Sequence, residues 1–181
     1  GLGDEDFAWD PAASAAVRNR YAEGKDYLFC CVARLEQEKN LGQLLEALAR
    51  FKARRGDCFR MLFIGEGNLL EQLCWQAETL GLRDNVYFTG GLPHKELSGY
   101  SPACDRFLFT SRSETQGIGL REAMAAGLPV VAVDASGVCD IVEDGKNGWK
   151  TPADAESFAE RLEDTLATGY VNLLRTGAEA T

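Results

Sequence analysis

Short apolar runs alternate with amphipathic segments along this chain of 181 residues, and this alternation constrains the fold more than any other feature. Apolar runs between polar flanks predict strands that are buried on both faces. We expect them at residues 27–33, 60–64, 86–89, 106–110, 130–133 and, briefly, 148–150. Strands that alternate with helices imply right-handed βαβ units. The sequence therefore predicts a Rossmann-like α/β fold with a parallel sheet and helices on both faces.

The helical segments between these runs have readable limits. A first short helix is expected near residues 14–22, and Asn40 is the expected N-cap of a helix whose leucines recur at helical spacing. Later helices are expected near residues 69–80, 93–100, 137–143 and 154–166. A further helix begins near Gly117 and ends at Gly127, before Pro129.

Residues 111–131 combine a strand end, a polar turn, a helix and the next strand. Gly117 and Gly119 leave the backbone bare at the helix start, where unpaired N–H groups favour phosphate. Glu114 and Glu122, with seven residues between them, would bracket the same ligand. Carboxylates repel phosphate, so we expect them to bind hydroxyl groups, and phosphate with hydroxyls describes a sugar nucleotide. The alternative is that Glu114 is a solvated charge and Glu122 an ordinary helix former.

Other polar groups also follow expected strands, at the edge where such sheets bind ligands. Arg34 and Lys39 follow the first strand, Glu66 the second, and Gly91 with Leu92 the third. Polar groups at successive strand ends favour a common site at this edge.

Arg34 and Lys39 suit a phosphate group, because Arg offers a planar fork and Lys a point charge. The alternative for both is a set of surface salt bridges with Glu36 and Glu38. Glu66 is expected to shape its loop, and a contact with the ligand is the alternative.

Composition argues against several classes of protein. A net charge of −9 and a pI near 4.7 disfavour a nucleic-acid binder. The one basic run consists of Arg50, Lys52, Arg54 and Arg55. We interpret this run as the solvated last turn of a helix and not as a lipid-binding patch. Fragments beginning at Gly65 and Gly117 imitate a dinucleotide fingerprint but lack its third small residue, which disfavours a nicotinamide dehydrogenase.

The six cysteines have no metal-binding spacing and are expected to be buried, reduced thiols of a cytoplasmic protein. No apolar stretch is long enough to span a membrane, and the acidic N-terminus does not resemble a signal peptide. We expect residues 1–26 to be a linker, residues 27–170 the ligand-binding domain and residues 171–181 a truncated tail.

The two glutamates stand in a longer pattern: Glu114, seven residues, Glu122, then Ala-Met-Ala-x-Gly-x-Pro-Val-Val. This pattern resembles the signature of the retaining GT-B glycosyltransferases of family 4, the group 1 proteins. The resemblance covers about residues 28–166 and implies the C-terminal, donor-binding half of a two-domain enzyme. It implies transfer of a sugar from a nucleotide sugar, with a UDP-sugar as the expected donor, to a glycan or glycolipid, with retention and with no required metal or other cofactor.

The resemblance also implies roles for individual residues. Arg34 and Lys39 would hold the donor diphosphate and, with Glu114, would form the catalytic group. Glu114 would contact hydroxyls of the donor sugar, and Glu122 would bind the nucleotide ribose. The remaining donor-binding positions would be Gly91, Leu92, Gly117, Ile118 and Gly119.

The chain departs from the family in two respects. It reads Glu-Thr-Gln-Gly from Glu114, where the family commonly has phenylalanine before the glycine, and this variant resembles some bacterial enzymes that make glycolipids. The acceptor-binding half, through which the protein would reach a membrane, is absent, so we expect this chain to bind donor without turnover. The alternatives are a non-catalytic domain that binds a nucleotide sugar or a protein partner, and an epimerase or phosphorylase with different site residues.

Overall fold

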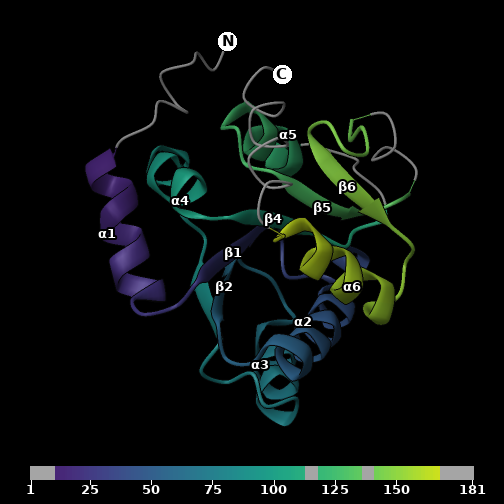
Figure 1. Cartoon of the computed structure of the whole chain (residues 1–181). Helices are drawn as coiled ribbons and strands as arrows, with labels where there is room; N and C mark the ends of the chain where they lie inside the picture. Colours follow the sequence, from purple (N-terminus) through teal and green to yellow (C-terminus); the bar gives the residue numbers. More distant parts are fainter. Residues whose placement is uncertain (1–10, 113–117, 136–140, 168–181) are drawn as a thin grey trace.

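The computed structural model describes residues 11–112, 118–135 and 141–167 (Figure 1). Its centre is a six-stranded sheet in the order β3-β2-β1-β4-β5-β6, and neighbouring strands pair in parallel. The strands are β1 (Tyr27–Val32), β2 (Phe59–Ile64), β3 (Val86–Gly90), β4 (Arg106–Phe109), β5 (Val130–Val133) and β6 (Gly148–Thr151). Each lies within one residue of its expected bounds. The predicted fold class is confirmed.

Helices cover both faces of the sheet, as Figure 1 shows. Side chains of β1 alternate between two cores, with Phe29 and Cys31 in one and Leu28 and Cys30 in the other. The first core is closed by α2 (Leu41–Arg55), α3 (Leu70–Thr79) and α6 (Ala155–Thr165). The second is closed by α1 (Pro11–Ala22), α4 (Leu97–Ala103) and α5 (Ile118–Ala125). This burial on both faces explains why the strands read as continuous apolar runs.

Helix α1 begins three residues earlier than the helix expected near residues 14–22, and it packs against α4. Arg18 donates from Nη1 to the Ala103 carbonyl at 3.1 Å and to Asp105 Oδ2 at 2.7 Å. The same Asp105 oxygen accepts from the Leu28 amide at 2.8 Å. Asp105 therefore joins α1, β1 and the start of β4.

The basic run at the end of α2 is paired with α6. Arg50 donates to Glu156 at 2.9 Å, and Arg54 contacts Glu156 and, at 3.3 Å, Glu160. Arg54 and Arg55 also lie 3.6 and 3.8 Å from Glu163. The expectation of a merely solvated helix turn was therefore incomplete, because these arginines form an ion-pair network between two helices.

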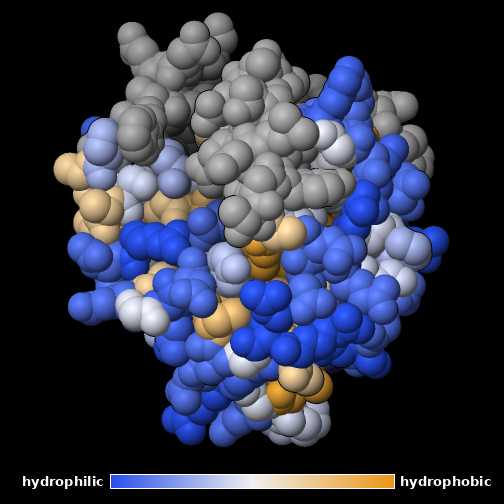
Figure 2. Space-filling view, viewed as in Figure 1, coloured by the Kyte–Doolittle hydropathy of each residue, from blue (hydrophilic) through white to orange (hydrophobic). Residues whose placement is uncertain are grey.

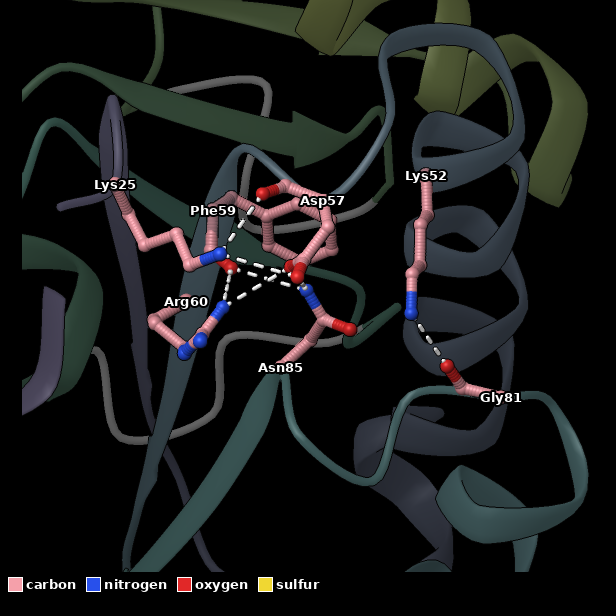
Figure 3. Close-up of polar contacts among 7 residues, drawn as sticks. All are labelled: Lys25, Lys52, Asp57, Phe59, Arg60, Gly81 and Asn85. Carbon is pink, nitrogen blue, oxygen red and sulfur yellow. Dashed lines mark hydrogen bonds and ion pairs between the residues drawn. The ribbon is translucent and has the colours of Figure 1, made fainter.

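A polar cluster lies at the amino ends of β2 and β3, away from the strand ends considered for ligand binding (Figure 3). Asn85 is fully buried and donates from Nδ2 to Asp57 Oδ1 at 2.8 Å and to the Phe59 carbonyl at 3.0 Å. Lys25 Nζ and Arg60 Nη1 reach the Asp57 carboxylate at 3.0 and 3.1 Å. Burial would raise the pKa of Asp57, but hydrogen bonds from Lys25 and Asn85 outweigh it and lower the pKa. This cluster fastens the entry of β2 to its neighbours.

The cysteines correct one expectation. Cys30, Cys31 and Cys104 are buried, but Cys74 is exposed, so burial does not hold for every cysteine; Cys139 lies outside the described residues. A hydrogen bond with Cys104, together with burial, raises the pKa of the Cys30 thiol well above its ordinary value. The surface seen in Figure 2 is mainly hydrophilic with small apolar areas. In the part of the chain that the structure describes, no helix combines the length and apolar character that crossing a membrane requires.

Candidate functional site

The strand order reverses between β1 and β4, and this reversal locates the candidate site. From β1 the chain proceeds to β2 and β3 on one side, whereas β4 is followed by β5 and β6 on the other. Loops after β1 and β4 therefore leave the same sheet edge in opposite directions. Such a crevice at the carboxyl ends of the strands is where open α/β sheets bind ligands.

The loop after β1 forms the first wall of this crevice. Arg34 is exposed over 75% of its side chain, and its Nε and Nη2 both donate to Glu36 Oε1, at 3.1 and 2.7 Å. Lys39 ends a short 3-10 helix, η2 (Gln37–Lys39), and is half-buried. No hydrogen bond or ion pair engages the Lys39 ammonium within the described ranges. The salt bridge of Arg34 with Glu36, one of the alternatives expected from the sequence, is thus present.

The loop after β2 lies directly on the first wall. The Leu35 amide donates to the Glu66 carbonyl at 2.9 Å, which fastens the two loops together. A Cβ at Gly67 would lie 2.6 Å from the carbonyl carbon of Leu35, and one at Gly65 would lie 2.9 Å from that of Ala33. Both glycines therefore permit close packing of main chain on main chain, which accounts for them without a dinucleotide.

Gly91 and Leu92 follow β3 at the same edge, as expected. Gly91 is exposed, and a Cβ there would lie 3.3 Å from the carboxyl carbon of Glu66. Leu92 is partly buried against the core that α4 and α5 share. Glu66 thus borders Gly91 while its own main chain supports Leu35, which agrees with its expected role in shaping the loop.

The second wall begins at Thr110 and Ser111, directly after β4, and both residues are buried. Glu114 and Gly117 lie outside the described residues. Ile118 and Gly119 form the first turn of α5, and Glu122 is half-buried farther along this helix. The described part of α5 therefore begins on the β4 side of the strand-order reversal, while Arg34 and Lys39 follow β1 on the other side.

Sequence reasoning missed the residues that join the two walls. Thr110 Oγ1 donates to the Lys39 and Asn40 carbonyls at 2.9 and 3.0 Å. Asn40 is not a side-chain N-cap: it takes a left-handed conformation with φ 52° and ψ 39°, and its Nδ2 donates across the crevice to the Thr110 carbonyl at 3.4 Å. The available signal was a pair of small hydroxyl residues, Thr110 and Ser111, after a buried strand.

The arrangement can hold an elongated anion that also bears hydroxyl groups. Arg34 and Lys39 supply cations on the first wall, and on the other side α5 carries Glu122, which is half-buried. Among the described residues, no group of three His, Cys, Asp or Glu side chains could hold a metal ion. The fold and the strand-order reversal together define an α/β domain of the doubly wound class.

The family model described as Glycosyl transferases group 1 matches residues 15–176 of the sequence. The chain belongs to this family, and the resemblance found in the sequence is confirmed. The match includes most of α1 and extends past α6.

Two relatives show the range of the family. The chain is 33% identical over 175 residues to the GDP-mannose-dependent alpha-(1-6)-phosphatidylinositol monomannoside mannosyltransferase of Mycolicibacterium smegmatis, covering 92% of this chain and 46% of that protein. It is 31% identical over 141 residues to the alpha-monoglucosyldiacylglycerol synthase of Streptococcus pneumoniae, covering 78% of this chain and 32% of that protein. The chain thus spans less than half the length of these relatives.

Solved structures agree with the fold. HepE of Anabaena, in complex with UDP and glucose, matches with a TM-score of 0.87 at 25% identity, over 99% of this chain and 50% of that one. The C-terminal domain of LpcC, a glycosyl transferase group 1 family protein of Francisella tularensis, matches with a TM-score of 0.82 over 99% of this chain and 95% of that one. At 18% identity, the second likeness bears on the fold alone.

Proposed function

We propose that this chain is the donor-binding part of a retaining glycosyltransferase that moves a sugar from a UDP-sugar to a glycan or glycolipid. The observation that carries the proposal is the fastening of the Arg34 and Lys39 loop to the end of β4, which holds two cationic side chains at the strand-order reversal. The likeness to HepE, whose complexes contain UDP, glucose and UDP-glucose, supports the choice of ligand.

The donor diphosphate binds to Arg34 and Lys39. The pair between Arg34 and Glu36 does not oppose this role, because an ion pair with the Arg34 side chain 75% exposed contributes about 0–1 kcal/mol and exchanges readily for a more highly charged partner. Both cations then stabilise the negative charge that develops on the departing diphosphate. No metal or other cofactor is required for this step.

The two glutamates bind the rest of the donor. Glu122, half-buried on α5, accepts hydrogen bonds from the ribose, and Glu114 accepts them from the sugar. Main-chain groups of Gly117, Ile118 and Gly119 lie along the diphosphate, and the turn at Gly91 and Leu92 borders the base.

The acceptor site belongs to a second, N-terminal half that this chain does not contain. The relatives named above act on phosphatidylinositol monomannoside and make a glucosyldiacylglycerol, which supports a lipid-linked acceptor over a soluble one. We propose that the protein works in the cytoplasm and reaches the membrane surface through that second half. Catalysis needs both halves, so the present chain binds donor without transferring sugar.

Calorimetric titration tests this proposal. The 181-residue chain is titrated with UDP, GDP and ADP and then with their glucose and mannose conjugates. We expect saturable binding with UDP preferred, and a loss of tenfold or more in Lys39→Met, because a hydrogen bond to a charged group is worth about 1.5–3 kcal/mol. The matched control is Lys146→Met, an exposed lysine in the turn before β6 that pairs with Glu143.

Each outcome separates a different part of the proposal. A preference for GDP would keep the donor role and change the nucleotide, in line with the GDP-mannose-dependent relative. Equal losses in Lys39→Met and Lys146→Met would contradict the diphosphate site. Binding by the chain together with no transfer by the two-domain protein would favour a non-catalytic nucleotide-sugar-binding domain.

A further inference from the structure

Side-chain contacts connect the two walls of the site beyond the last residue pair of the β1–β4 ladder. The β1–β4 ladder pairs Phe29 with Arg106 and Cys30 with Phe107, and no later pair extends it toward the site. Beyond these pairs, side chains also connect the first wall to the second.

Thr110 provides the central contact. It is 1% exposed, and its Oγ1 lies 2.9 Å from the Lys39 carbonyl and 3.0 Å from the Asn40 carbonyl. One hydroxyl hydrogen shared between two carbonyl oxygens forms a three-centre hydrogen bond. Asn40 and Lys39, which lie 70 and 71 positions before Thr110 in the sequence, are thus both held by the Thr110 hydroxyl of the opposite wall.

Asn40 makes a second contact between the two walls. Among the described residues it is the one non-glycine residue with positive φ, a conformation that a Cβ disfavours and that surrounding structure must maintain. Its Nδ2 donates to the Thr110 carbonyl at 3.4 Å, which glycine at this position could not do. The Ser111 hydroxyl adds a longer contact of 3.5 Å to the Glu38 carbonyl.

We propose that Thr110 and Asn40 form a clasp that positions Lys39 for the donor diphosphate. The clasp fixes the main chain on both sides of the Lys39 carbonyl, so the side chain starts from one defined point beside the end of β4. Thr110 and Asn40 are positioning residues and act through Lys39. This inference rests on the proposed function, in which Lys39 binds the diphosphate.

A double-mutant cycle on the whole chain tests the clasp, with UDP as the probe and GDP and ADP as second and third probes. Thr110→Val keeps the shape and removes the hydroxyl, whereas Thr110→Ser keeps the hydroxyl. We expect the dissociation constant for UDP to be about five- to tenfold larger in Thr110→Val and to change by less than about twofold in Thr110→Ser. In the Lys39→Met background, Thr110→Val should cause no further loss, because coupled residues are not additive.

A second variant guards against a folding defect. Asn40→Gly keeps the left-handed conformation without strain and removes the Cβ together with the amide that contacts Thr110, so we expect about a two- to threefold loss of UDP affinity with an unchanged unfolding midpoint. A purely structural role of Thr110 would give additive losses with and without Lys39, and that result would overturn the clasp. Wild-type affinity in Thr110→Val would overturn it as well while leaving the donor role intact. A wild-type chain that binds none of the three nucleotides would remove the proposed function and the clasp together.

Discussion

The guanidinium carbon of Arg106 lies 5.2 Å from the ring centre of Trp149, and each of these residues is at most 1% exposed. From this position at the start of β4, Arg106 donates from Nη2 to the Thr165 carbonyl at 2.6 Å and from Nε to Thr165 Oγ1 at 3.1 Å. A cation at the carboxyl end of a helix is favoured by the helix dipole. Arg106 therefore fastens the end of α6 to the middle of the sheet.

Replacement of Arg106 should destabilise the chain strongly. Arg106→Met leaves the buried Thr165 carbonyl without this donor, which costs about 1–3 kcal/mol of stability. It also removes the cation–π contact with Trp149, which contributes about 0.5–2 kcal/mol. We expect urea unfolding to show a loss of about 2–4 kcal/mol. Arg83→Met is the control, because Arg83 is 79% exposed and lies 3.8 Å from Glu78, and it should change stability by less than about 0.5 kcal/mol. Similar values for both variants would contradict the role of Arg106.

Gly67→Ala should disturb the first wall of the site as well as the stability. Its Cβ would lie 2.6 Å from the Leu35 carbonyl carbon, so the main chain beside Arg34 must move. We expect a loss of about 1–3 kcal/mol in unfolding free energy and weaker binding of UDP in calorimetry. Gly42→Ala is the matched control in α2, because its Cβ meets only the flexible end of Gln76, 3.0 Å away. Undiminished UDP binding in Gly67→Ala would show that the two loops are independent.

The contact between Tyr21 and Tyr100 predicts a loss of stability in alkali. Burial, and then the Tyr21 hydroxyl 3.4 Å away, raise the pKa of Tyr100 to about 12. An unfolded tyrosine loses its proton near pH 10. The contribution of the raised pKa to the free energy of unfolding is therefore complete below about pH 10 and is lost as pH rises toward 12. Urea unfolding of the wild type and Tyr100→Phe should therefore show a steeper alkaline decline for the wild type. Parallel declines would mean that Tyr100 titrates alike in both states.

Replacement of Glu122 and of Glu114 should weaken the binding of different ligands. Glu122→Ala should weaken UDP about tenfold or more, because the ribose loses a charged hydrogen-bond acceptor. Glu114→Ala should spare UDP and weaken only UDP-glucose. Calorimetry with both ligands distinguishes them, with exposed Glu46→Ala as the control. Unchanged UDP affinity in Glu122→Ala would refute the ribose assignment.

The sheet could be predicted from sequence because each strand is buried on both faces, which leaves an apolar run with clear ends. The reversal of strand order was expected only as a general property of such sheets. The position of Arg34 and Lys39 after β1 followed from the same reasoning, as did Gly91 and Leu92 after β3.

What the sequence could not predict are contacts between distant residues. Asn40 before a run of leucines favours an N-cap, but the carbonyl it contacts belongs to Thr110, 70 positions later. The basic run of α2 looked solvated because its partners, including Glu156, lie more than 100 positions away on α6. Exposure of Cys74 depends on how α3 rotates on the sheet. These relations arise from packing and leave no local pattern.

The reversal between β1 and β4 has a consequence for how the molecule assembles. The walls of the crevice come from separate stretches of chain, residues 27–90 and 106–151, which meet along the central strand pair. A ligand that touches both walls binds only molecules in which the stretches have docked, and it therefore stabilises that docked state by mass action. The nucleotide sugar would connect the two stretches at the carboxyl ends of the central strands, and amide hydrogen exchange in β1 and β4 should slow when it binds.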